Sequence, residues 1–195
     1  MLWFVMLACF LSENCPAFNI GRFDMYMNQF YQADLATDSI KKEFAQEIVN
    51  CIWIKIAELI WLLPQNGSRY YAGYSGFTNL SVGGRNIDGS DAVNDVSFMA
   101  VEATSQVALP QPSLSVIIQP DTPQEFLLAC CRLARKGIGF PAFHNDQVGT
   151  QMMMYAGLRQ DDAREWTLIG CVVPHHRKDY EWTEAGGYNM APALE

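Results

Sequence analysis

Residues 113–143 decide the fold that this sequence predicts, and they read SLSVIIQPDTPQEFLLACCRLARKGIGFPAF. Two short apolar runs, 113–119 and 138–143, have the length of strands. Between them, Thr-Pro-Gln-Glu at 122–125 has the form of a capping box with proline at the first helical position, and Gly137 suits the left-handed stop of a helix. This alternation of strand and helix favours an α/β architecture in which helices pack outside a sheet or barrel.

Helical periodicity extends the pattern toward the N-terminus. Apolar side chains recur every three or four positions from residue 40 to residue 63, which predicts a long helix that Ser39 can cap. Residues 67–91 are rich in glycine, and we expect a loop there with one short strand near 78–82. The next helix should be capped by Asp91 or Asn94. The expected buried face of the long helix is Ile40, Phe44, Ile48, Ile52, Ile56, Leu59 and Leu63.

Both ends of the chain also carry helical signals. Residues 1–18 are largely apolar and predict a buried helix, which a break at residues 19–22 follows. Asn145 or Asp146 should cap a methionine-rich helix, and a short helix is expected at 161–166 before a run that reaches Cys171. The stripe of the methionine-rich helix expected in the core is Val148, Met152 and Tyr155.

Composition narrows the class of protein. The 195 residues suggest one domain or part of a larger one, and half of them are apolar, which is ample for a core. Thirteen basic against 21 acidic residues give a net charge of −8, which argues against nucleic acid or an anionic membrane surface as a partner. The apolar start has no basic residue before Arg22 and is too short to span a bilayer.

The six cysteines do not predict a metal site. They lie at positions 9, 15, 51, 130, 131 and 171, with no C-x-x-C pair and no Cys/His cluster at zinc spacing. Cys51, Cys130 and Cys131 fall inside helical patterns, so we expect small buried side chains in a reducing, cytoplasmic protein.

Cys171 is the candidate catalytic residue. It lies in the apolar run Gly170-Cys171-Val172-Val173-Pro174, and apolar surroundings disfavour a thiolate. A thiol that reacts by losing a hydrogen atom needs no charge and gains from the exclusion of water. Three other hypotheses are weaker: a Cys171–His175 nucleophile, which Pro174 separates and which lacks an oxyanion hole; metal binding by His144, His175 and His176; and acid–base work by Glu181 and Glu184.

A set of short phrases in order along the chain resembles the glycyl radical enzymes, the superfamily of pyruvate formate-lyase. Each phrase is weak alone, whereas the ordered set covers essentially the whole chain. The phrases are IGRFD at 20–24, FTNL at 77–80, GG-x-x-x-DG-x-DA-x-N at 83–94, EA at 102–103, LPQPSLSV at 109–116, G-x-G-x-PA-x-x-ND at 137–146, DAR at 162–164 and GCV-x-P at 170–174.

The resemblance implies part of a ten-stranded β/α barrel with outer helices, and residues 1–195 would be a partial pyruvate formate-lyase-like barrel domain. In this family one central loop carries a cysteine, matched by Cys171, and a second loop carries a glycine on which a radical is stored. An iron–sulfur, S-adenosylmethionine-dependent activating enzyme installs that radical. The C-terminal glycyl radical domain, with its Arg-Val-x-Gly-Tyr type motif, is absent from this sequence. We therefore expect no cofactor bound by the chain itself and no activity from it alone.

Departures from the family pattern indicate which member the chain resembles. Pyruvate formate-lyase has a second cysteine where Val172 stands, so acyl transfer is disfavoured. Dehydratases, choline lyase and hydroxyphenylacetate decarboxylase have a basic Glu where Val173 stands, and valine cannot move a proton. Radical addition to a C=C bond needs no such base. The sequence therefore predicts a fragment of the catalytic subunit of an enzyme that adds a hydrocarbon to fumarate, an alkylsuccinate or benzylsuccinate synthase.

The same resemblance predicts the rest of the site. Phe77 and Val173 would line the pocket, and Arg177 would contact a fumarate carboxylate. Expected partners are hydrocarbon and fumarate as substrates, the activating enzyme, small accessory subunits and further copies of the chain, with no nucleic acid and no membrane. The alternatives are another glycyl radical enzyme, such as an arylacetate decarboxylase, a dehydratase or a formate acetyltransferase-like lyase, and a domain that keeps the barrel framework without catalysis.

Overall fold

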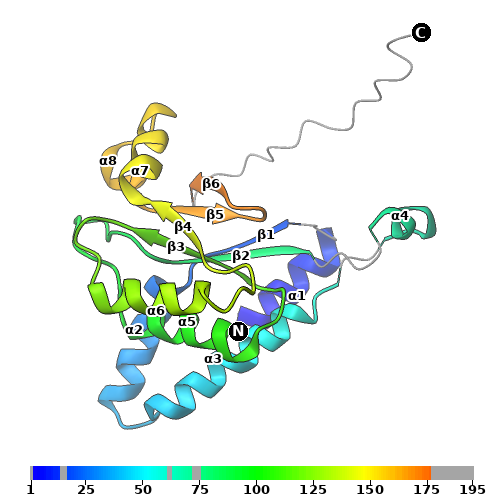
Figure 1. Cartoon of the computed structure of the whole chain (residues 1–195), viewed down its shortest axis with the longest axis horizontal. Helices are drawn as coiled ribbons and strands as arrows, with labels where there is room; N and C mark the ends of the chain where they lie inside the picture. Colours follow the sequence, from blue (N-terminus) through cyan, green and yellow to red (C-terminus); the bar gives the residue numbers. More distant parts are fainter. Residues whose placement is uncertain (1, 14–16, 61–62, 72–75, 177–195) are drawn as a thin grey trace.

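A parallel sheet forms the centre of the molecule. The computed structural model describes residues 2–13, 17–60, 63–71 and 76–176. Within them, four parallel strands lie side by side in sequence order, as Figure 1 shows. Sequential parallel order is the arrangement of a barrel wall, which confirms the predicted α/β class. The strands are β1 (Ala17–Arg22), β2 (Phe77–Gly83), β3 (Ser113–Ile118) and β4 (Ala142–Asn145).

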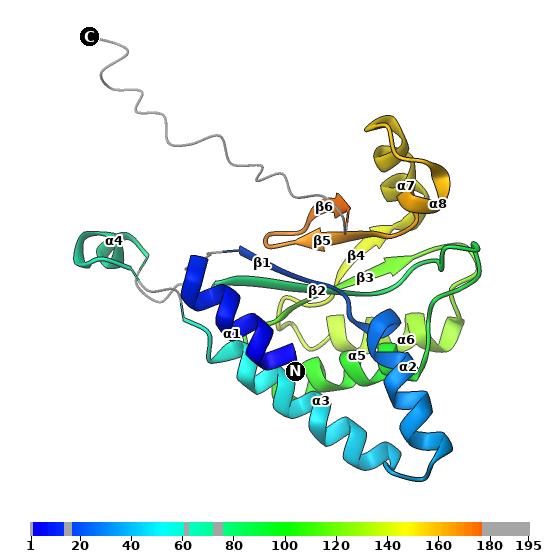
Figure 2. The ribbon, with the colours of Figure 1, turned by 180° about the vertical axis from the view of Figure 1, so that it is seen from behind.

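Helices cover one face of this sheet, and a β-hairpin lies on the other (Figures 1 and 2). The covering helices are α1 (Leu2–Glu13), α2 (Phe23–Ala36), α3 (Lys42–Ala57), α5 (Asp95–Val107) and α6 (Gln124–Ala134). The hairpin consists of β5 (Trp166–Ile169) and β6 (Val173–His176), and the short helices are α4 (Gln65–Tyr70), α7 (Asp146–Tyr155) and α8 (Gln160–Ala163). None of the described helices is long and apolar enough to cross a membrane.

The two faces of the sheet differ in polarity because side chains alternate along a strand. Leu80 and Val82 of β2 and Val116 of β3 are fully buried in the main apolar core, toward the helices. The residues between them are polar. Asn79 and Ser81 bond to the hairpin region on the opposite face, so the hairpin packs on a polar surface.

The strand–helix–strand unit that the sequence predicts is confirmed at β3, α6 and β4. The cap of α6 is different from the prediction, since the Thr122 hydroxyl accepts from the Gln119 N–H (2.9 Å) and not from the helix. Gly83 and Gly84, which the sequence places in a loop, lie at the end of β2 and allow close packing. A Cβ on Gly83 would lie 2.6 Å from the Ile117 carbonyl oxygen.

The break predicted at residues 19–22 is wrong, because this segment is part of β1. The register shifts between Asn19 and Gly21, and the Gly21 N–H donates to Asn19 Oδ1 (2.7 Å). In a sequence, an Asn close to a Gly predicts a turn. In this strand the two residues form a β-bulge. Helix α1 is also less buried than expected, with Phe4 and Leu11 exposed.

The predicted buried face of the long helix is confirmed at Ile56 and Leu59 but is rotated over the rest of the helix. Phe44 and Ile48 are exposed, and the buried residues of α3 are Ala45, Val49, Trp53 and Ile56. Trp53 decides the rotation: its ring packs edge-on against Phe23 with centroids 5.5 Å apart, and its Nε1 donates to Thr104 Oγ1 (2.9 Å). Burying the largest side chain outweighs burying the more regular isoleucine stripe.

Two further core predictions are wrong. Val148, Met152 and Tyr155 of α7 are exposed, Tyr155 by 85%, and the helix instead buries Gly149 and Met153. Gly149 faces Trp166 and leaves no room for a Cβ next to the indole. Of the three helical cysteines only Cys130 is buried, and burial raises the pKa of its thiol to about 12.

Candidate active site

Cys171 lies at the tip of the β5–β6 hairpin. The strands are antiparallel, and Ile169 pairs with Val173, which leaves Gly170, Cys171 and Val172 as the connecting loop. The Val172 N–H donates to the Ile169 carbonyl (3.0 Å) and closes this loop. The thiol is therefore carried on a short, hydrogen-bonded turn.

Two left-handed residues flank the cysteine. Gly170 has φ +50° and Val172 has φ +79°. The second value is unusual, because a β-branched side chain disfavours this region and the strain costs on the order of 1–3 kcal/mol. Such strain is found where a loop must point one side chain in a required direction. In this loop the residue between the two left-handed positions is Cys171.

The hairpin rests on strands β1 and β2. Asn79 Nδ2 donates to the Gly170 carbonyl (3.3 Å), and Ser81 Oγ lies 3.1 Å from Thr167 Oγ1. Gly170 is pressed against β1, because a Cβ on it would lie 2.8 Å from the Ala17 Cβ. These contacts fix the cysteine loop relative to the sheet.

The structure brings two of the predicted site residues beside Cys171. Phe77, half-buried at the start of β2, lies under the loop, because a Cβ on Gly170 would be 3.7 Å from the Phe77 Cβ. Val173 is the first residue of β6 and is 44% exposed. Arg177 lies outside the described residues.

The expected sealed apolar surroundings of the thiol are not built by the described residues. Cys171 and Val172 are both exposed at the hairpin tip. The neighbouring face of the sheet is polar, not apolar. The hairpin also separates Cys171 from His175, which pairs with Thr167 further along the strands.

Two buried charged side chains, Arg22 and Asp24, join the elements below the hairpin. Asp24 Oδ2 accepts from the Gly83 N–H and the Ser97 hydroxyl, both at 2.6 Å, and Arg22 donates to the carbonyls of Gly83 and Arg85. Burial raises the pKa of Asp24 and lowers that of Arg22, and each charge offsets the effect on the other. Residues 22 and 24 thus tie β1, α2, β2 and α5 together, which gives the sequence phrase IGRFD a structural role.

A cavity of about 290 Å³ with both polar and apolar lining lies beside β1. The Tyr26 hydroxyl is buried there, and burial raises the pKa of Tyr26. Thr167, which lines the cavity, also bonds to Ser81 below the hairpin. The cavity therefore extends the polar surface on which the hairpin lies. Its lining is Asn19, Ile20, Gly21, Arg22, Met25, Tyr26, Glu165 and Thr167.

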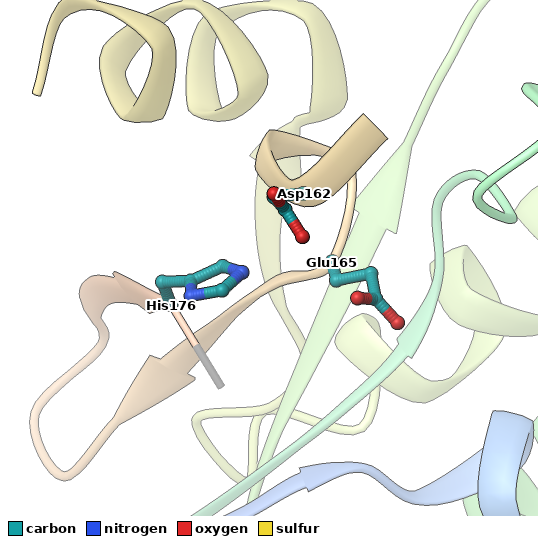
Figure 3. Close-up of side chains that lie close together, drawn as sticks. All are labelled: Asp162, Glu165 and His176. Carbon is teal, nitrogen blue, oxygen red and sulfur yellow. The ribbon is translucent and has the colours of Figure 1, made fainter. Parts of the chain in front are cut away.

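Figure 3 shows a cluster of ionisable side chains at the base of the hairpin. Asp162, Glu165 and His176 each present one ligand-type atom, and these atoms lie within 4.8 Å of one another. The sequence did not predict the cluster. The hairpin pairs His176 with Trp166, and this pairing brings His176 close to Glu165. A tetrahedral cation needs ligand atoms about 3.3 Å apart. The Glu165 carboxylate also interacts with Arg22, where it partly offsets the effect of burial on the Arg22 pKa.

Comparison with known proteins agrees with this geometry. Residues 1–195 match the family model described as pyruvate formate lyase-like. The chain belongs to this family. One curated relative is the trans-4-hydroxy-L-proline dehydratase of Clostridioides difficile, 37% identical over 175 residues that cover 88% of this chain and 22% of the relative.

Two solved structures show the same arrangement. The glycerol-bound form of the B12-independent glycerol dehydratase from Clostridium butyricum is 45% identical, with a TM-score of 0.74, and covers 80% of this chain and 20% of its own. A glycyl radical enzyme from Archaeoglobus fulgidus is 26% identical, with a TM-score of 0.83, over 90% of this chain and 23% of its own. The chain thus spans about a fifth of the length of the relatives it matches.

Proposed function

We propose that this chain is the cysteine-bearing part of a glycyl radical lyase of the dehydratase kind. Cys171 would lose its hydrogen atom to a stored radical that a full-length enzyme supplies, and its sulfur would then take a hydrogen atom from a substrate C–H bond. The observation that carries the proposal is the placement of Cys171 at the tip of a strained hairpin above a parallel sheet.

The polar groups near the hairpin favour a polar substrate over an apolar one. Asn79, Ser81 and Thr167 are buried between the hairpin and the sheet and bonded there, so the polar groups open to a substrate are those that line the cavity beside β1. The Tyr26 hydroxyl lines this cavity and has no partner among the described residues, and a hydrocarbon would leave it so at a cost of about 1–3 kcal/mol. Hydroxyl-bearing substrates fit this cavity better. The matches to dehydratases point the same way.

Fumarate addition is the second candidate function, and one residue favours it. Val173 stands where a dehydratase of this family is expected to have a basic glutamate. A dehydration has to move a proton, which valine cannot do. In the dehydratase proposal the base must therefore come from another residue, whereas radical addition to fumarate needs none.

Product analysis separates the two functions. A full-length polypeptide that contains these residues would be activated anaerobically by its activating enzyme and given either a 1,2-diol or trans-4-hydroxyproline, or fumarate with a hydrocarbon. We expect loss of water from a hydroxylated substrate and no succinate adduct. A succinate adduct without any dehydration would overturn the proposal in favour of the second function.

A further inference from the structure

Asn79 is the buried side chain that reaches the cysteine loop from the sheet. It lies on the central strand β2, is fully buried, and pairs in register with Asn19 on β1 and Ser113 on β3. Its Nδ2 donates to the carbonyl of Gly170, the residue directly before Cys171 (3.3 Å). This is a contact between positions 91 residues apart in the chain.

The amide oxygen of Asn79 lowers the stability of the folded chain. Asn79 Oδ1 is buried and accepts no hydrogen bond within the described part of the chain. A buried polar atom left without a partner costs about 1–3 kcal/mol, and an apolar side chain of similar size would avoid this cost. Folding alone therefore does not account for an amide at this position. The bond to Gly170 is what the amide adds.

Other contacts of the hairpin act elsewhere. The Ser81–Thr167 bond holds the middle of β5, and the Val172–Ile169 bond lies inside the loop itself. Among residues 76–176, the side-chain hydrogen bond from the sheet to the loop 170–172 comes from Asn79. The height of the thiol above the sheet thus depends on this bond and on the contact of Gly170 with Ala17.

We propose that Asn79 is a positioning residue that sets the place of the Cys171 sulfur through the Gly170 carbonyl. This inference rests on the proposed radical function. Hydrogen-atom transfer needs the reacting atoms about 3–3.5 Å apart, and a displacement of about 1 Å can cost on the order of 100-fold in rate. Asn79 acts on the distance between sulfur and substrate without contacting the substrate.

Two variants and a matched control test the inference. Asn79→Asp keeps the shape and removes the donor, and Asn79→Leu removes both polar ends. Ser115→Ala is the control, because Ser115 is also fully buried on the central sheet and its Oγ has no partner among the described residues. All three would be made in a full-length polypeptide that contains this chain, activated anaerobically. The stored radical in each would be counted by electron paramagnetic resonance.

The expected result is a split between rate and binding. Both Asn79 variants should lower kcat per radical by about tenfold or more, with KM changed by less than about threefold, while Ser115→Ala stays within about twofold of the parent. Equal kcat per radical in the Asn79 variants and in the control would overturn the inference. Cys171→Ser separates this failure from failure of the proposed function: if it is inactive while the Asn79 variants are fully active, only the positioning role is lost.

Discussion

At the scale of single residues, the cysteine loop is held by close packing under one glycine. Gly170 has a left-handed φ and no room for a side chain above Ala17. Val172, two positions further on, has a strained positive φ. A sequence can reveal that Cys171 follows a glycine, but the contact with Ala17 joins residues 153 positions apart and only the fold shows it.

Replacing Gly170 by alanine should loosen the hairpin. The added Cβ would meet the Ala17 Cβ at 2.8 Å, and alanine at φ +50° costs about 1–2 kcal/mol in addition. We expect faster hydrogen–deuterium exchange of the Val172 amide, with little change in helices α5 and α6. Unchanged exchange at Val172 would show that the loop does not depend on this packing.

His144 should make the chain less stable in mild acid. It lies on β4 beside the Trp166 ring, and burial lowers the pKa of its imidazole. Below the ordinary histidine pKa of about 6.5, the unfolded chain binds a proton that the folded chain does not, so the free energy of unfolding falls as the pH falls. Denaturant titrations between about pH 7.5 and pH 5.5 should show a smaller fall for His144→Gln than for the parent. Equal falls in the two proteins would argue against this account.

At the scale of elements, helix α5 begins with a complete capping box. Asn94 Oδ1 accepts from the N–H groups of Val96 (2.9 Å) and Ser97 (3.3 Å), and Ser97 Oγ accepts from the Asn94 N–H (3.0 Å). Ser39, predicted to cap α3, does not do so; the helix starts after Lys41 without a side-chain cap. Substituting the residue that caps its helix, Asn94, and the one that does not, Ser39, therefore gives a matched pair of variants.

Asn94→Ala should destabilise the chain by about 1 kcal/mol or more, because two N–H groups at the start of α5 lose their acceptor. Ser39→Ala should change stability by less than about 0.5 kcal/mol. The free energy of unfolding of both variants, measured with urea, checks this. A larger loss for Ser39→Ala than for Asn94→Ala would mean that the observed caps do not control stability.

The elements also show where sequence reasoning succeeds and where it fails. Strand β3, helix α6 and the cap of α7 by Asn145 follow from local patterns, and local hydrogen bonds form them. The rotation of α3 and the bulge in β1 depend on partners far along the chain, Phe23 for Trp53 and β2 for Asn19. The polar face below Cys171 was missed for the same reason, since its members come from separate strands.

At the scale of the whole molecule, much apolar surface lies outside the core. The outer faces of α1 and α3 expose Phe4, Phe44 and Ile48, and a largely apolar groove runs between these helices past Trp3 and Ile52. Strands β1 and β4 stand at the two edges of the described sheet. Such surface is typical of regions that pack against further protein.

The 195-residue chain by itself should therefore self-associate. Phe44→Glu should reduce this association, because it places a charge in the apolar groove near the start of α3. Tyr70→Glu is the control, at an exposed aromatic on the separate helix α4. Sedimentation velocity at several concentrations provides the measurement. Equal association of the two variants would place the contact surface elsewhere.

The central claim is that the thiol of Cys171 carries the hydrogen-atom transfer. The most direct test compares Cys171→Ser with Cys131→Ser, an exposed cysteine on α6, in an activated full-length polypeptide containing this chain. We predict equal amounts of stored radical in both, normal turnover for Cys131→Ser and no product from Cys171→Ser. Product formed by Cys171→Ser at the parent's rate per radical would contradict the account.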